Sequence, residues 1–149
     1  MTTSNFTLTL LTEKTPAEVF QAISNVREWW SGYHSEEIMG RSVNLNDEFS
    51  FSAAGGIHYS RQKLVEVIPD KKIVWLITDS DFGYIAKKDE WTGTKVIFEI
   101  SEKEGKTHLV FTHEGLTPAV ECYETCAPSW TMYLQNKLLP LINTKNRLS

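Results

Sequence analysis

Apolar positions in the last part of the chain recur with the period of an α-helix. Between residues 128 and 143 they fall every three or four residues on one side, together with Lys137, whose aliphatic stem can lie along an apolar surface. The apolar members of this side are Trp130, Tyr133, Leu134, Leu138, Leu141 and Ile142. We expect Pro128 in the first helical turn and a disturbance at Pro140, because proline lacks a backbone N–H. A stripe of this width needs an apolar surface to cover it.

Apolar and polar residues upstream of this helix alternate with a period of two, which is typical of half-buried β-strands. The alternation predicts strands over residues 6–10, 36–41, 47–53, 57–67, 73–78, 94–101 and 107–112. Gly55-Gly56 predicts a hairpin turn. In the strand over residues 57–67, four apolar residues at alternate positions are predicted to share one face: Ile57, Tyr59, Val65 and Val67. The connections are of hairpin length, so the predicted sheet is antiparallel.

Two short helices are predicted after the first strand. Thr15-Pro16-Ala17-Glu18 is a capping box with proline at the first helical position, and the helix that it opens should end near Asn25. A second helical piece is expected over residues 27–32. Neighbouring residues on a helix point in different directions, so we expect one of Trp29 and Trp30 to pack inward and the other to border an opening.

Residues 79–93 form the longest predicted irregular stretch, and this stretch is rich in aromatic residues. It carries Phe82, Tyr84, Ile85 and Trp91. A loop of this composition favours a cover over something rather than a plain connection. Further on, Thr117-Pro118 repeats the cap-plus-proline pattern, which predicts a short helix toward Cys126 ahead of the long one.

Four local features carry a resemblance to a known family. They are Thr15-Pro16-Ala17-Glu18-Val19-Phe20 followed by Trp29-Trp30; Glu66-Val67-Ile68-Pro69 followed by Trp75; Thr94 to Glu99 leading to His113-Glu114-Gly115-Leu116; and Ser129-Trp130 with Leu134 and Leu138. In this order and spacing the chain resembles the helix-grip fold of the START-like (SRPBCC) superfamily, and within it the bacterial relatives of the activator of heat-shock protein 90 ATPase. The family often has Gly where this chain has Ser129.

The resemblance implies an α+β fold in which a curved antiparallel sheet of about seven strands surrounds the C-terminal helix. It covers nearly the whole chain, so residues 1–149 are expected to form one domain. The fold hosts carriers, cyclases, hydroxylase components and co-chaperones, and these proteins bind ligands between the sheet and the terminal helix. The resemblance therefore implies a place for a site but no single activity.

Composition and charge narrow the function classes. A net charge of −4 with scattered basic residues argues against a nucleic-acid partner. No apolar run is long enough to span a membrane. Cys122 and Cys126 are expected to be free thiols, which favours a cytoplasmic protein, and a monomer or a homodimer fits the chain.

Residues that could carry metal or acid–base chemistry are few. Cys122, Cys126 and His113 offer too few ligands for structural zinc, so no metal and no cofactor is predicted. His113 and Glu114 are neighbours on a strand and point to opposite faces, so they cannot address one substrate atom together. We interpret His113 as a structural residue bonded to the backbone, and His58 beside Tyr59 has the same limitation.

The acidic residues that flank the aromatic loop are Asp79, Asp81, Asp89 and Glu90. Two carboxylates with separated pKa values could do acid–base work, but acidic residues in loops are usually solvated. No catalytic residue is therefore predicted.

The remaining signal is an excess of large rings, which fits an apolar cavity between the sheet and the terminal helix. The predicted ligand-binding residues are Trp30, Phe51, Tyr59, Trp75, Phe82, Tyr84, Phe98, Trp130, Tyr133 and Leu134. Trp75 and Phe51 should line the floor of the cavity, and the loop with Phe82 and Tyr84 should cover its mouth. The same rings would also fit an ordinary packed core.

Three functions from different classes stay open. The first is binding of a hydrophobic or aromatic small molecule in the cavity. The second is a chaperone-regulating or other protein-interaction role, which the resemblance implies. The third is a cyclase- or hydrolase-like enzyme that uses the same cavity, although the lack of a catalytic constellation favours a protein that is not an enzyme.

Overall fold

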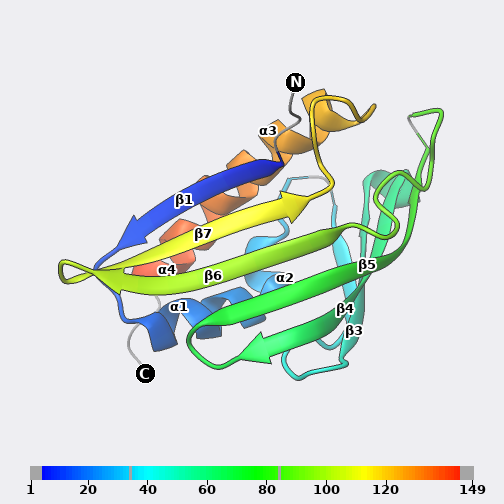
Figure 1. Ribbon diagram of the computed structural model, residues 1–149. Coiled ribbons are helices and arrows are strands. Elements are labelled where there is room, and N and C mark those ends of the chain that lie inside the picture. Colours follow the sequence, from blue (N-terminus) through cyan, green and yellow to red (C-terminus); the bar gives the residue numbers. More distant parts are fainter. Residues whose placement is uncertain (1–4, 34, 84, 145–149) are drawn as a thin grey trace.

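One antiparallel sheet of seven strands dominates the computed structural model, which describes residues 5–33, 35–83 and 85–144 (Figure 1). The strands are β1 (Phe6–Thr12), β2 (Glu37–Gly40), β3 (Glu48–Ala53), β4 (His58–Ile68), β5 (Lys72–Phe82), β6 (Lys95–Lys103) and β7 (Lys106–Glu114). Their order in the sheet is β1-β7-β6-β5-β4-β3-β2, so β5 lies at the centre. The α+β fold predicted from the strand spacings and the resemblance is confirmed.

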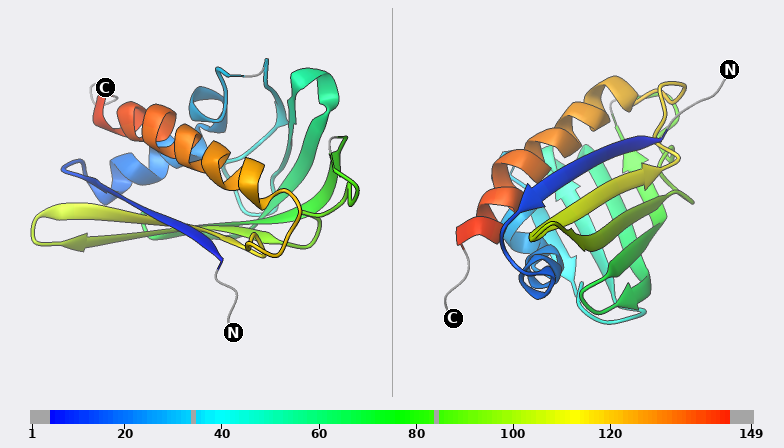
Figure 2. Two further views of the ribbon diagram at one scale, coloured as in Figure 1. Left: turned by 90° about the horizontal axis from the view of Figure 1, so that it is seen from above. Right: turned by 60° about the vertical axis from the view of Figure 1, so that its left-hand side comes forward.

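All of the α-helices lie on one side of this sheet, and the end that contains β2 and β3 curves toward them (Figure 2). The helical segments are α1 (Pro16–Ser24), α2 (Val26–Trp29), the single turn η1 (Ala54–Gly56), α3 (Tyr123–Tyr133), η2 (Leu134–Leu138) and α4 (Leu139–Thr144). The predicted capping box opens α1: Glu18 N–H donates to Thr15 Oγ1 at 3.1 Å, and Thr15 N–H donates to Glu18 Oε1 at 2.9 Å.

The C-terminal helix begins earlier than predicted. Its first residue is Tyr123, so that Pro128 lies inside α3 rather than in the first turn. The short helix predicted after Thr117-Pro118 is wrong, because residues 118–122 form turns and a bend. The carboxylate of Glu90 accepts the backbone N–H groups of Glu121 (2.6 Å) and Cys122 (2.9 Å), and these bonds satisfy donors just ahead of the helix.

Pro140 explains the change of winding in the same helix. Residues Leu134–Leu138 form a π-helical segment, and Leu139 N–H donates to the carbonyl of Leu134. A proline ring crowds the carbonyl four residues before it and offers no N–H in return. The wider turn ahead of Pro140 accommodates that ring, so the helix continues through α4 instead of ending.

The inner face of β4 is not the one that the apolar alternation predicted. Ser60, Gln62 and Leu64 are each 0% exposed and point toward the helices. Tyr59 pairs with Ser52 and Asp81 on the outer face. Apolar parity is misleading here because the buried positions are polar, and Gln62 Nε2 donates to Ser60 Oγ inside the sheet layer. Irregularities in pairing at Arg61/Gln62 and Leu64/Glu66 shift the parity again before Val67, which packs on the core.

The two tryptophans after α1 lie as predicted in that Trp29 packs inward and Trp30 borders an opening, the cavity described below, although both side chains are buried. Trp29 is 0% exposed and donates its indole N–H to the carbonyl of Ile23 at 3.2 Å, while Trp30 is 2% exposed. The helix α2 ends at Trp29, and Trp30 follows with φ −93° and ψ 55°. Helical spacing therefore no longer separates the two side chains, and their rings stack with centroids 6.2 Å apart.

Candidate functional site

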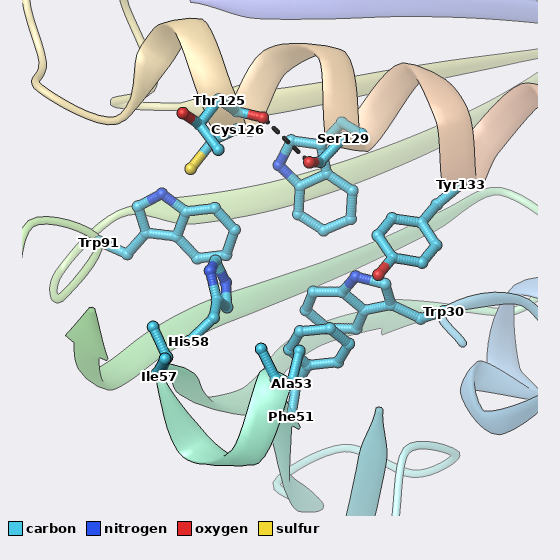
Figure 3. Close-up of a pocket in the computed structure, with 12 residues that line it drawn as sticks. Trp30, Phe51, Ala53, Ile57, His58, Trp91, Thr125, Cys126, Ser129 and Tyr133 are labelled. Carbon is cyan, nitrogen blue, oxygen red and sulfur yellow. Dashed lines mark hydrogen bonds between the residues drawn. The ribbon is translucent and has the colours of Figure 1, made fainter. Parts of the chain in front are cut away.

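A cavity of about 250 Å³ lies between α3 and the end of the sheet formed by β3, η1 and β4 (Figure 3). Its walls are Trp30, Phe51, Ala53, Ala54, Ile57, His58, Trp91, Thr125, Cys126, Ser129, Trp130 and Tyr133. The helix α3 supplies the residues of one wall at helical spacing, and β3 with η1 and β4 supplies those of the facing wall. Trp91 comes from the connection between β5 and β6.

Three indole rings give the cavity a rigid aromatic wall. Trp91 and Trp130 stack at an interplanar angle of 7° with centroids 5.8 Å apart. Trp130 in turn stacks on Trp30 at 5.0 Å, and Trp30 lies on Phe51 at 3.9 Å with an angle of 12°. Offset stacks of this kind are favourable and restrict ring motion. The cavity therefore presents ring faces and edges in fixed positions.

His58 is the imidazole of the cavity wall. Its ring stacks on Phe82 at 4.2 Å and meets Trp91 edge to face at 5.2 Å. In Figure 3 the ring nitrogens of His58 point up toward the helix wall of the cavity. The side chain therefore brings polar atoms to a predominantly apolar surface.

Two hydroxyl groups of α3 at the cavity already donate within the protein. Ser129 Oγ–H donates to the carbonyl of Thr125 at 2.9 Å, the bond drawn in Figure 3. Tyr133 O–H donates to Glu36 Oε2, whose carboxylate also accepts the backbone N–H groups of Gly32 and Tyr33. Burial, and next the bond to Glu36, raises the pKa of Tyr133 well above its ordinary value. Tyr133 is therefore a fixed, protonated donor.

His113 supports the aromatic wall from behind. Trp130 donates its indole N–H to His113 Nδ1 at 3.1 Å, and His113 Nε2 lies 2.9 Å from Thr94 Oγ1. Thr94 Oγ1–H donates to the carbonyl of Trp91 at 2.6 Å, so His113 Nε2–H is the donor to Thr94. Burial lowers the pKa of His113 to about 3, so the ring is neutral near pH 7.

His113 and Glu114 lie on opposite faces of β7, as predicted, because His113 is buried and Glu114 is exposed. The prediction that His113 bonds to the backbone is wrong, since its hydrogen-bond partners are the side chains of Trp130 and Thr94. These partners come from α3 and from the residue before β6, and no local sequence pattern brings them together.

The two cysteines are joined by a disulfide, so the prediction of free thiols is wrong. Positions four apart share a helix face, and the Cα atoms of Cys122 and Cys126 lie 5.6 Å apart, which is within the range of disulfides. Trp91 donates its indole N–H to Cys122 Sγ at 3.3 Å. A disulfide does not favour a cytoplasmic location, so the expectation drawn from reduced thiols loses its basis. Within residues 5–33, 35–83 and 85–144, no three His, Cys, Asp or Glu side chains group as metal ligands.

Four of the predicted ligand-binding residues line the cavity together: Trp30, Phe51, Trp130 and Tyr133. Four others are buried outside its walls: Trp75, Phe82, Phe98 and Leu134. Trp75 does not form the floor, because the ring of Trp30 stacks on it at 5.7 Å. Tyr59 faces away from the cavity, and Tyr84 lies outside the described residues.

The predicted irregular stretch over residues 79–93 is shorter in the structure, because β5 continues through Phe82. Phe82 is 0% exposed beneath His58 and does not cover the mouth. Among the described residues of this connection, Trp91 supplies the ring that reaches the cavity. A pattern based on apolar runs does not detect a strand that continues past polar residues, and Asp79 and Asp81 on the outer face are such residues.

Sequence reasoning missed eight lining residues: Ala53, Ala54, Ile57, His58, Trp91, Thr125, Cys126 and Ser129. Four of them had a usable signal. Ala53 shares the strand face of Phe51, and Trp91 belongs to the ring-rich stretch over residues 79–93. Ser129 and Cys126 precede Tyr133 and Trp130 by four positions each, so they share the helix face of those rings. The positions on η1 and β4 had none, because their placement depends on the inner face of β4.

No helix in the described part of the chain combines the length and the apolar character that crossing a membrane requires.

Comparisons with solved structures support the fold. A solution structure of an Aha1 dimer from Colwellia psychrerythraea is 20% identical, with a TM-score of 0.72, over 96% of this chain and 98% of that chain. A protein from Mesorhizobium loti is 17% identical, with a TM-score of 0.67, over 91% and 96% of the two chains. A protein from Bacillus halodurans is 14% identical, with a TM-score of 0.66, over 96% and 100%.

Sequence comparison gives the family. The model of the family described as activator of Hsp90 ATPase homolog 1-like protein matches residues 13–142. No curated protein matches the chain significantly. The matched segment includes α1, all of the cavity walls and most of the C-terminal helix.

Proposed function

The chain belongs to the family of activator of Hsp90 ATPase homolog 1-like proteins, and on that premise we propose that it binds a flat, apolar or aromatic small molecule. The binding site in this proposal is the cavity between α3 and the β3–β4 end of the sheet. The observation that carries the proposal is a space of about 250 Å³ walled by four large rings, Trp30, Phe51, Trp91 and Trp130. Natural packing leaves few voids larger than a water molecule, so a space of this size is not ordinary core.

The volume limits the size of the ligand. An engineered apolar cavity of about 150 Å³ binds benzene, and ligand clefts usually begin at about 300 Å³. A cavity of about 250 Å³ lies between these values. It fits a compound somewhat larger than a single aromatic ring, and the parallel indoles favour a flat one.

The polar atoms at the wall give the ligand an orientation. The hydroxyl hydrogen of Ser129 is directed to Thr125, so the oxygen of Ser129 is left to accept from a ligand O–H or N–H. His58 supplies ring nitrogens from the facing wall. A ring compound with one hydrogen-bonding substituent matches this arrangement best.

The cavity offers little for acid–base catalysis, which favours binding over the enzymatic alternative. Tyr133 is held protonated by burial and by Glu36, and His113 lies behind Trp130 with a lowered pKa. His58 is then the one imidazole among the described lining residues. A cyclase-like reaction needs a second group to return or accept a proton, and the described walls hold no Asp, Glu, Lys or Arg.

A chaperone-related role is the second candidate, and two observations favour it. The family description names the activator of Hsp90 ATPase, and the relative from Colwellia psychrerythraea is an Aha1 dimer. The chain also exposes apolar side chains around β2: Met39 is 68%, Val43 54% and Leu45 55% exposed. Exposed apolar groups of this kind occur at protein-interaction surfaces. This candidate implies a cytoplasmic chain and allows a homodimer.

A cavity-filling variant tests the binding proposal. Ala53 lies on the cavity wall and is 5% exposed, whereas Ser52 is its neighbour on the outer face of β3. We expect Ala53→Phe to lower the uptake of a fluorescent apolar probe by at least about tenfold while the protein stays folded, because the added ring occupies the space. Ser52→Phe, the matched control, should take up the probe like the wild type.

Wild-type protein that takes up no probe would reject the binding proposal. So would an Ala53→Phe variant that binds the probe as well as the wild type. Native mass spectrometry of protein purified under mild conditions would identify a retained ligand directly.

A further inference from the structure

The two sulfurs of the disulfide have different surroundings. Cys126 lines the cavity, whereas Cys122 is 0% exposed and does not belong to the cavity wall. In Figure 3 the sulfur of Cys126 lies beside the ring of Trp91 at the edge of the cavity. A molecule that enters the cavity therefore meets Cys126, whereas Cys122 lies outside the cavity wall.

The hidden sulfur has a hydrogen-bond donor for the charge that it carries as a leaving group. Cys122 Sγ accepts the indole N–H of Trp91 at 3.3 Å and lies at the N-terminus of α3, where a negative charge is favoured. The carboxylate of Glu90, bonded to the N–H groups of Glu121 and Cys122, opposes the helix contribution. The direct donor, Trp91 N–H, is not engaged by Glu90, and it stabilises a thiolate on Cys122.

We propose that Cys126 is a site of reversible modification by a small apolar thiol that enters through the cavity. The small thiol enters the cavity in its neutral S–H form, and its sulfur forms a new S–S bond with Cys126 Sγ as its S–H bond breaks. The bond between Cys126 and Cys122 breaks, its electron pair stays on Cys122 as a thiolate, and the proton of the small thiol passes to solvent. One disulfide replaces another, so no further oxidant or reductant is consumed. Attack of the Cys122 thiolate on Cys126 reverses the step and expels the small thiol.

The walls of the cavity select the class of thiol. The described lining residues include no Lys, Arg, Asp or Glu, so a charged group would lose its hydration without an ionic partner. A volume of about 250 Å³ also leaves little room for a peptide thiol. An aromatic or alkyl thiol of low molecular weight fits both limits. The inference rests on the cavity of the proposed function, but it requires only that a small thiol can enter this cavity.

The first test uses the two single-thiol variants. Cys122→Ser leaves the thiol of Cys126 at the cavity, and Cys126→Ser leaves the buried thiol of Cys122. Each is treated with dithiodipyridine, a neutral aromatic disulfide that releases a chromophore when a thiol attacks it. We expect Cys122→Ser to react at least about tenfold faster, because only its thiol faces the entry path. Equal rates would overturn the proposal.

A charged reagent tests the selection by the cavity. Dithiobis(nitrobenzoate) is also an aromatic disulfide, but it carries two carboxylates. For Cys122→Ser, the ratio of the neutral to the charged rate should exceed the ratio for a free small thiol by about tenfold, because the charged reagent must be desolvated. The same ratio for protein and free thiol would mean that the sulfur is attacked from solvent, which contradicts the inference.

The wild-type protein provides the test with both sulfurs present. It is incubated with benzyl mercaptan, quenched with acid, alkylated and mapped by mass spectrometry. The benzylthio group should be found on Cys126 and the alkyl group on Cys122. The reverse distribution, or an equal mixture, would overturn the proposal even if one serine variant fails to fold.

Probe uptake separates the two proposals. A protein that takes up the apolar probe but shows no preference for Cys126 contradicts this inference alone. A protein that takes up no probe but is modified selectively at Cys126 contradicts the binding of larger ligands and supports the inference. Ala53→Phe, which narrows the cavity, should slow the modification of Cys126, and Ser52→Phe should not.

Discussion

Trp130 donates its indole N–H to Nδ1 of His113 across 3.1 Å, and this bond ties the C-terminal helix to the sheet behind the cavity. Trp130 is 2% exposed and His113 is 0% exposed, so neither group can turn to water instead. A buried donor without an acceptor costs about 1–3 kcal/mol, which is more than a typical hydrogen bond contributes. The orientation of Trp130, and with it the aromatic wall, depends on His113.

Replacing His113 by leucine should therefore destabilise the protein by about 1–3 kcal/mol, because Trp130 N–H loses its acceptor. The free energy of unfolding is measured with urea. His108→Leu on the same strand is the matched control, since His108 lies on the outer face of β7, and a change within about 0.5 kcal/mol is expected. A His113→Leu variant as stable as the wild type would show that the bond does not anchor the helix.

The same residue predicts how stability depends on pH. Burial lowers the pKa of His113 from 6.5 to about 3 in the folded state, so the unfolded chain binds the proton more tightly. Stability from this group is fully present above pH 6.5 and is lost as the pH falls from 6.5 toward about 3. The greatest slope for one such group is about 1.4 kcal/mol per pH unit.

Carboxylates also titrate in acid, so the measurement is a comparison. Urea unfolding of the wild type and of His113→Leu at a series of pH values should give curves that converge as the pH falls below 6.5. Parallel curves across this range would contradict a neutral, buried His113 in the folded protein.

Leu134 distinguishes the cavity from the packed core around it. The side chain is 0% exposed and does not line the cavity, although the sequence pattern grouped it with Trp130 and Tyr133. Leu134→Trp should overpack the core and cost about 1–3 kcal/mol. Gln135→Trp, on the exposed neighbour, should have little effect. If Leu134→Trp were tolerated, the space beside Leu134 would be larger than the structure has it.

The sheet and the terminal helix could be predicted from the sequence because apolar periodicity records which faces are buried. Phe49, Phe51 and Ala53 alternate cleanly on β3, and all three are buried. The pattern fails where buried positions are polar. Ser60 and Gln62 occupy the inner face of β4, so Tyr59 was assigned to the wrong side. Because β4 was assigned the wrong inner face, the wrong residues of this strand were predicted for the cavity wall.

The cavity itself depends on contacts between residues far apart in the sequence. Trp91 reaches α3 through the bond to Cys122, and Glu90 holds the start of that helix. Neither contact has a local signature, because each joins a connection between strands to a helix about thirty residues later, a separation that local patterns do not cover. The excess of large rings indicated a site, but the placement of the rings follows from the folded structure.

The bond between Tyr133 and Glu36 joins the cavity wall on α3 to the residue that precedes β2. Tyr133 lines the cavity, and its O–H donates to a carboxylate that also accepts the N–H groups of Gly32 and Tyr33. Hydrogen bonds to charged groups contribute about 1.5–3 kcal/mol, and the partial exposure of Glu36 favours the lower end. A double-mutant cycle isolates this contribution from other effects of each change.

We expect Tyr133→Phe and Glu36→Ala to show a coupling energy of about 1–2 kcal/mol in urea unfolding. The control cycle replaces Glu36→Ala by Glu37→Ala, on the exposed neighbour, and should give a coupling within about 0.5 kcal/mol of zero. Tyr133→Phe keeps the ring on the cavity wall, so its uptake of the apolar probe should match the wild type. Loss of uptake without measurable coupling would instead mean that the hydroxyl of Tyr133 serves the ligand rather than the loop that contains Glu36.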